Sequence, residues 1–182
     1  PTKDIQEEWY EQDPERTALF LKDRNKAVSL LEKIAADEYY DRGNIAESKA
    51  LYEKSVEHNA QNGGALAKLG VIDILEGNEK KGVTKCLKAG EISQECYFSD
   101  IGLAFYGRED LEKAREWFKK DLNHKPTAQG AYNLGIIAYE DNKPEERVQW
   151  LEKSLQLDPE YWDSCILLGS IYDEGGRMDD AI

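Results

Sequence analysis

The 182-residue chain carries 37 acidic against 24 basic side chains, a formal net charge of -13, and 40% of its residues are hydrophobic. This negative charge repels phosphate backbones and anionic lipid headgroups, so neither nucleic acid nor a membrane surface is expected as a partner. The hydrophobic content is enough for a continuous core, and the apolar stretches are far shorter than a membrane span, so direct membrane insertion is not expected either.

Cysteine usage indicates a reducing compartment. Cys86, Cys96 and Cys165 are odd in number and lack Cys-x-x-Cys spacing, which fits free thiols better than a disulfide framework. The chain is therefore predicted to be cytoplasmic. Because it begins at Pro1 and stops at Ile182 inside a predicted helix, we expect it to be a fragment of a longer protein.

Residues 1–28 are predicted to be an N-terminal leader with a capping helix. The apolar residues Leu19, Leu21, Val28 and Leu31 predict a helix that continues into the segment that follows.

The segment ahead of Pro14 has a different composition. It places Ile5, Trp9 and Tyr10 among acidic residues, as in either a free tail or a strap packed on the rest of the chain. The sequence leaves both readings open.

From residue 29 onward the chain repeats a two-helix pattern. Each unit has an apolar residue followed by a small one, a turn signal about seven residues later, and then a second stretch with helical apolar spacing. The small residues are Ala36, Gly70, Gly102, Gly135 and Gly169, separated by steps of 34, 32, 33 and 34 residues. The turn signals are Gly43-Asn44, Gly77-Asn78, Glu109-Asp110, Asn142-Lys143 and Gly176-Arg177.

The pattern predicts five units in chain order. Four are complete helix pairs and the last is truncated: repeat 1 at 29–62, repeat 2 at 63–94, repeat 3 at 95–127, repeat 4 at 128–161, and partial repeat 5 at 162–182. In each pair a small residue on the first helix lets the second helix approach, and a bulky residue on the second fills the remaining space.

Residues 128–161 carry the clearest family resemblance. Leu134-Gly135, Ser154-Leu155 and Leu157-Asp158-Pro159 stand where a tetratricopeptide repeat has them, and the unit resembles that family almost throughout. The resemblance extends over about residues 29–182. It implies an all-α fold, a right-handed superhelical solenoid of antiparallel helix pairs, which binds other proteins.

Four residues depart from the family pattern. Pro144 is expected in the first turn of a helix, where its missing N–H costs nothing. Arg147 and Asp121 replace small residues, and we expect both to snorkel or turn outward if the local packing shifts by part of a turn. Asp73 stands between two isoleucines, so its carboxylate needs a partner such as a lysine from a neighbouring helix.

The resemblance implies that the first helices line a concave surface for partners. Helical spacing from the small residue of each unit shows which side chains should face this groove, and its middle is apolar and rich in tyrosine. With acidic flanks around it, we expect a protein or peptide ligand that is apolar or aromatic with basic flanks. The predicted partner-binding residues are Tyr40, Val71, Ile74, Leu103, Tyr106, Tyr132, Asn133, Ile136, Tyr139 and Ile166.

The carboxylate clamp of some co-chaperones in this family is not apparent. Lys33 stands at one clamp position, but its asparagine companion is replaced by Asp37. Lys68, Cys96 and Asp100 occupy the positions where an asparagine and two basic residues would be expected. Asn133 keeps an asparagine that in the family often hydrogen-bonds the ligand's backbone.

The predicted function is a scaffold or adaptor that holds a partner helix or peptide in the groove. Two alternatives remain open. One is a co-chaperone or secretion-type chaperone that shields apolar segments, and the other is a homo-oligomeric scaffold assembled through exposed repeat ends.

No catalytic or metal-binding motif stands out. His58 and His124 fall near the ends of second helices, where an imidazolium is favourable against the helix dipole, and Cys86 takes a core position. Nucleotide-binding and metalloprotease motifs are absent from the sequence. The chain is therefore predicted not to be an enzyme and to need no cofactor or metal.

Overall fold

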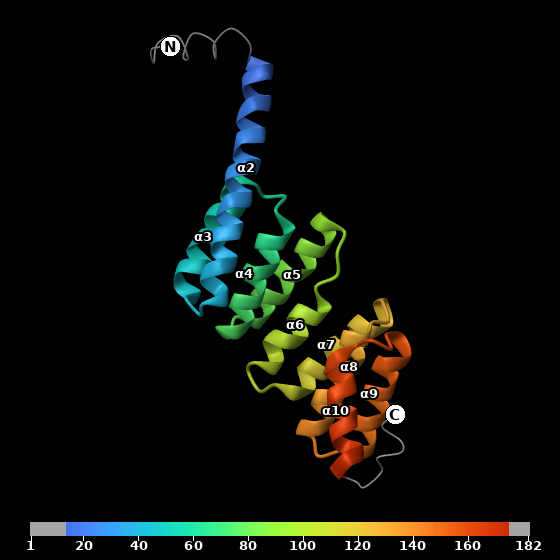
Figure 1. Ribbon diagram of the computed structural model, residues 1–182. Helices are drawn as coiled ribbons and strands as arrows, with labels where there is room; N and C mark the ends of the chain where they lie inside the picture. Colours follow the sequence, from blue (N-terminus) through green and yellow to red (C-terminus); the bar gives the residue numbers. More distant parts are fainter. Residues whose placement is uncertain (1–13, 175–182) are drawn as a thin grey trace. The chain divides into compact units, whose positions relative to one another are not determined.

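The computed structural model describes residues 14–174, and all regular secondary structure in this range is helical (Figure 1). In chain order the helices are α2 (Pro14–Asp41), α3 (Ile45–His58), α4 (Gly63–Leu75), α5 (Glu79–Ser93), α6 (Phe98–Tyr106), α7 (Leu111–His124), α8 (Ala128–Glu140), α9 (Pro144–Leu157) and α10 (Trp162–Glu174). Within this range no helix is both long enough and apolar enough to cross a bilayer.

The chain divides into two compact units. Unit 1 comprises Pro1–Ile72 and Thr84–Glu95, and unit 2 comprises Asp73–Val83 and Cys96–Ile182.

Unit 1 is built on the long helix α2. As predicted, one helix runs from the leader into the first repeat, across the expected boundary at residue 28. Its second half packs along α3, and its first half continues past the end of α3 (Figure 1). The core joins α2, α3 and α4 through Ala36, Tyr52, Ala65, Leu69 and Ile72.

Unit 2 contains the remaining repeats. Here α6 packs on α7, α7 on α8, α8 on α9, and α9 on α10, so each second helix lies against its own mate and the first helix of the following pair. This neighbour-to-neighbour packing is typical of a repeat array, because an isolated pair cannot cover its apolar faces. The first helix of the partial fifth repeat is α10, at Trp162–Glu174.

The small-facing-large arrangement is visible at atomic distances. A Cβ atom added to Gly102 would lie 2.5 Å from the ring of Phe118, and one added to Gly135 would lie 3.3 Å from Leu151. Sixteen residues separate the members of each pair (118 − 102 = 16; 151 − 135 = 16). Phe118 and Leu151 are fully buried, so a glycine is needed where the two helices approach most closely.

Four of the predicted turns have the backbone that their residues suggest. Gly43, Gly77, Glu109 and Asn142 have φ values of 78°, 92°, 62° and 57°, all in the left-handed region. After the third turn, Asp110 caps α7 by accepting a hydrogen bond from the Lys113 backbone N–H at 3.2 Å. The fifth turn signal, Gly176-Arg177, lies outside the described residues.

The four departures from the family pattern have separate outcomes. Pro144 begins α9, as predicted. Asp73 is fully buried, and Lys81 of the next helix reaches its Oδ1 at 3.3 Å, which confirms the expected lysine partner.

Asp121 and Arg147 are both half-buried, and each finds a partner within unit 2. Asp121 accepts a hydrogen bond from the Ser99 hydroxyl at 2.8 Å, and Arg147 stacks on the ring of Tyr139 with its Nε buried.

Candidate partner-binding surface

Seven of the ten predicted partner-binding residues belong to the first helices of unit 2. Leu103 and Tyr106 lie on α6, Ile166 lies on α10, and the other four lie on α8. We call this set, Leu103, Tyr106, Tyr132, Asn133, Ile136, Tyr139 and Ile166, the unit 2 strip.

The strip presents apolar area to solvent. The exposed fractions of Leu103, Tyr139 and Ile166 are 51%, 56% and 58%. Tyr106, Tyr132 and Ile136 are half-buried, which leaves part of each side chain accessible. Single exposed apolar residues need no explanation, but a set supplied by three first helices is typical of an interaction surface.

Hydrogen bonds and ring contacts hold the tyrosines of the strip in place. The Tyr106 hydroxyl donates to Glu140 Oε1 at 3.2 Å, which links α6 to α8. Tyr132 packs against Tyr161, with ring centroids 5.7 Å apart. A tyrosine that is already ordered loses little further rotamer freedom when a partner covers it.

The tyrosine hydroxyls of this region remain protonated donors at neutral pH. Burial raises the pKa of Tyr106, and the carboxylate of Glu140 raises it further. Burial, followed by the negative charge of Asp163, raises the pKa of Tyr161 to about 12. Both protons are already used, since the Tyr106 hydroxyl donates to Glu140 Oε1 and the Tyr161 hydroxyl donates to Gln129 Oε1. Each hydroxyl oxygen therefore meets a ligand as an acceptor.

Asn133 is the buried polar member of the strip. Its exposed fraction is 5%, and its Oδ1 accepts a hydrogen bond from Gln129 Nε2 at 3.0 Å. Its Nδ2 is buried and has no hydrogen-bond partner among the described residues. A buried donor without an acceptor costs about 1–3 kcal/mol, so a carbonyl oxygen reaching Nδ2 would recover that energy.

A cation lies against one tyrosine ring of the strip. The guanidinium of Arg147 lies 4.4 Å from the centroid of the Tyr139 ring. In the sequence Arg147 stands out only as a departure from the family pattern, which did not predict its stacking on Tyr139. A long cation next to an aromatic first-helix residue is the signal that could have indicated this stacking.

The three predicted residues outside the strip are placed differently. Tyr40 of unit 1 is half-buried, with Lys68 Nζ 5.3 Å from its ring centroid. Val71 and Ile74 have exposed fractions of 7% and 0%, so the expectation that they offer a surface to a partner is corrected. The reason is composition, because α4 reads GGALAKLGVIDIL, is apolar on nearly every side, and has most of its residues buried.

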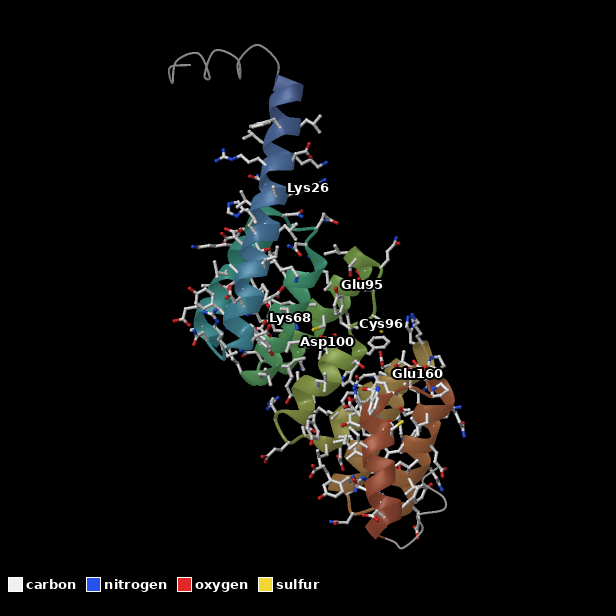
Figure 2. All side chains as sticks on the ribbon, in the orientation of Figure 1. Lys26, Lys68, Glu95, Cys96, Asp100 and Glu160 are labelled. Atoms are coloured by element: carbon white, nitrogen blue, oxygen red, sulfur yellow. The ribbon has the colours of Figure 1, made fainter. Side chains whose placement is uncertain are left out.

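The residues at the clamp positions of unit 1 form internal contacts. Lys33 Nζ donates to Asp37 Oδ2 at 2.7 Å, and the hydroxyl of the buried Tyr52 donates to Asp37 Oδ1 at 2.6 Å. Lys68, which stands at another clamp position, lies on α4 (Figure 2). The Asp37 carboxylate is thus used in packing α2 on α3 and offers nothing to a ligand's carboxylate tail.

The clamp positions of unit 2 carry no cation. Cys96 and Asp100 occupy them, both half-buried, and both are labelled in Figure 2. Burial raises the pKa of the Cys96 thiol, and the nearby Asp121 carboxylate adds to that shift, so the thiol stays protonated and weakly nucleophilic. All three cysteines are free thiols.

The two histidines have structural neighbours. His58 Nδ1 lies 2.8 Å from Glu32 Oε2, and the His124 ring meets Phe98 edge to face at 5.8 Å. Within residues 14–174, no three His, Cys, Asp or Glu side chains gather as they would around a metal ion.

Comparison with known proteins identifies one repeat unit and a set of similar chains. The family model described as Tetratricopeptide repeat matches residues 128–161, the range predicted for the fourth unit. The human protein O-mannosyl-transferase TMTC3 is 27% identical over 137 residues, which cover 71% of this chain. The chain spans only 15% of that protein's length.

Two solved structures show the same fold at low identity. PilF of Pseudomonas aeruginosa superposes with a TM-score of 0.63 at 19% identity, covering 86% of this chain and 73% of PilF. MamA of Desulfovibrio magneticus RS-1 superposes with a TM-score of 0.56 at 18% identity, covering 84% of this chain and 88% of that one. Both confirm an all-α solenoid of helix pairs.

Proposed function

We propose that the chain is a tetratricopeptide repeat protein and acts as a non-enzymatic scaffold or adaptor that binds a partner helix or extended peptide on the unit 2 strip. The observation that carries this proposal is the exposed set of tyrosine and aliphatic side chains on α6, α8 and α10. Free thiols and the acidic composition favour a cytoplasmic setting.

The chemistry of the strip defines the ligand. Exposed Leu103, Tyr139 and Ile166 supply apolar contact area for the anchoring side chains of a ligand. Carboxylates lie beside that area, because Glu140 bonds Tyr106 and the negative charge of Asp163 acts on Tyr132. A ligand with apolar or aromatic anchors and basic flanks therefore fits best.

The test uses peptides selected for binding to the full chain from a displayed library. Replacing Tyr106 and Tyr139 together by Ala should weaken the selected peptides at least tenfold, because two aromatic contacts are lost, while circular dichroism and melting stay nearly unchanged. The double variant Tyr39→Ala/Leu87→Ala removes two exposed apolar side chains of unit 1 and should bind as the parent does. Unaltered affinity in the Tyr106/Tyr139 variant would show that the strip is not the binding surface.

A single substitution addresses the buried amide. Asn133→Asp keeps the size of the side chain but replaces the unpartnered Nδ2 donor with an acceptor. If the amide meets a ligand carbonyl, this variant should bind selected peptides more weakly than Asn133→Ala does. Equal affinity in the two variants would show that the Asn133 amide does not contact the ligand.

A further inference from the structure

The first half of α2 has an unusual position in unit 1. Residues 18–27 are all exposed, and Leu19, Phe20 and Leu21 within them have exposed fractions of 59%, 55% and 42%. Because α2 continues past the end of α3, a step forms where the projecting helix meets the C-terminal end of α3 (Figure 1).

A cavity of about 330 Å³ lies at this step. Ala18, Leu21, Lys22, Asn25 and Lys26 line it from α2, and their spacing of i, i+3, i+4, i+7 and i+8 places them on one helix face. The end of α3 and the loop after it add His58, Asn59 and Gln61. The volume is in the range of small binding pockets and exceeds that of one large side chain.

The charge of the cavity is opposite to that of the chain. Its lining contains Lys22, Lys26 and His58 but no carboxylate, although the chain as a whole has a net charge of -13. Neither lysine forms an ion pair with a described residue, whereas His58 is turned to Glu32 at 2.8 Å. Two uncompensated ammonium groups beside a partly apolar hollow favour a ligand that is acidic and also has an apolar part.

We propose that this cavity is a second docking site, which binds an acidic segment of a partner protein through one aromatic or aliphatic anchor. The anchor packs on Ala18 and Leu21, and flanking carboxylates pair with Lys22 and Lys26. Asn25, Asn59 and Gln61 offer amide groups to the ligand's backbone. The site prefers acidic flanks where the unit 2 strip prefers basic ones, so the scaffold would recognise two kinds of segment.

The test measures fluorescence anisotropy of a labelled 15-residue probe with the full chain. The probe has one Trp with Glu three and four residues on either side, on an Ala background, and its matched control has Gln in place of Glu. The acidic probe should bind at least tenfold more tightly than the Gln probe and should lose affinity as salt is raised. Equal binding of the two probes would overturn the proposal.

Matched variants locate the contact. Lys22→Glu/Lys26→Glu should weaken the acidic probe at least tenfold, and the control Lys54→Glu/Lys88→Glu, with the same change in net charge, should alter affinity less than twofold. Leu21→Ala should weaken binding about threefold, as expected for a contact of a few methyl groups, while Leu19→Ala on the same helix should have no effect. Equal losses in the two lysine pairs would mean a long-range field without a docking site.

Further measurements test whether the unit 2 strip, the chain's own leader or a second copy accounts for binding at this cavity. Tyr106→Ala/Tyr139→Ala should leave the acidic probe unaffected, so failure of the unit 2 strip and failure of this cavity are distinguishable. If Trp9→Ala/Tyr10→Ala in the full chain raises probe affinity tenfold, the chain's own leader competes for the cavity, and assignment to a partner is overturned. A concentration-dependent dimer that Lys22→Glu/Lys26→Glu abolishes would assign the cavity to a second copy and would also overturn it.

Discussion

The helix pairs α6–α7 and α2–α3 solve the same packing problem with different chemistry. In α6–α7 the closest approach is apolar, with Gly102 against the ring of Phe118. In α2–α3 the buried pair at the corresponding positions is Ala36 and Tyr52, and the Tyr52 hydroxyl donates to Asp37 at 2.6 Å.

The other polar contacts of these two helix pairs differ in how deeply they are buried. Ser29 and Ser55 are fully buried between α2 and α3, and each hydroxyl donates to the other residue's backbone carbonyl at 2.7 Å. Around α6–α7 the ion pairs lie near the surface, where Glu79 meets Lys113 at 2.8 Å. The repeat thus requires a small residue facing a large one, and it tolerates polar groups in the core wherever both partners are supplied.

The largest expected effect is on the apolar pair. Phe118→Ala should destabilise unit 2 by about 3–5 kcal/mol, because a fully buried aromatic ring is lost and the helices cannot close the cavity completely. Urea unfolding followed by circular dichroism measures this loss, with Lys119→Ala, an exposed neighbour, as the control. A loss below about 1 kcal/mol would show that Phe118 does not hold this pair together.

The next largest effect is expected at Gly102, which faces the ring of Phe118. Gly102→Ala should cost about 1–3 kcal/mol, because the added Cβ meets Phe118 at 2.5 Å. Gly135→Ala should cost less, since its Cβ would lie 3.3 Å from Leu151. Gly169→Ala should be neutral or stabilising, because nothing lies within 4 Å and Ala is the better helix former.

A double variant isolates the contact in this series. In the Phe118→Ala background Gly102→Ala should lose most of its cost, because the ring that it meets is gone. If the stability losses of Gly102→Ala and Phe118→Ala simply add, the cost of Gly102→Ala does not come from contact with the Phe118 ring.

A smaller effect is expected when the Tyr52 hydroxyl that donates to Asp37 is removed. Tyr52→Phe should destabilise unit 1 by about 1–2 kcal/mol, since it removes a buried hydroxyl that donates to a carboxylate. Burial, together with the hydrogen bond to Asp37, raises the pKa of Tyr52, so the phenol stays neutral throughout the useful pH range. Tyr39→Phe, at an exposed position of α2, is the matched control and should have no measurable effect.

The smallest effect concerns the surface ion pairs near α7, and it depends on pH. Hydrogen bonds from Lys113 and Arg108 lower the pKa of Glu79, so its stabilising contribution is present above the unfolded-state pKa and is lost as pH falls through the folded-state pKa. Glu79→Gln should therefore lower Tm slightly at pH 7, and the difference from the parent should vanish at lower pH. Glu112→Gln, an exposed position on α7, should show no such convergence, and a Glu79→Gln difference that is constant from pH 7 to pH 3 would contradict this assignment.

Much of the fold follows from local sequence, and the clearest case is the turns. Gly43, Gly77 and Asn142 are residue types that accept a left-handed backbone, and all three adopt it. The period of the small residues then sets which helices pair, because Ala36, Gly102 and Gly135 are each followed sixteen positions later by a large buried residue, Tyr52, Phe118 and Leu151.

The candidate site was less predictable. Helical spacing identified the strip residues of α6, α8 and α10, but it also selected Val71 and Ile74, which the structure buries. Spacing tells which side of a helix a residue occupies, whereas exposure depends on what covers that side. In α4 the apolar character of the whole helix was the better guide.

The sequence by itself determined the repeat period, the helix pairs, the left-handed turns and the small residues at close approach, because each depends on the conformational preferences of a few neighbouring residues. Only the tertiary structure decided that Asp121 turns to Ser99, that Arg147 stacks on Tyr139, and that α2 and the end of α3 line a basic cavity. These features join residues 8 to 43 positions apart in the chain and on different helices (147 − 139 = 8; 61 − 18 = 43), so their partners and burial are set by packing between helices, which no local pattern encodes.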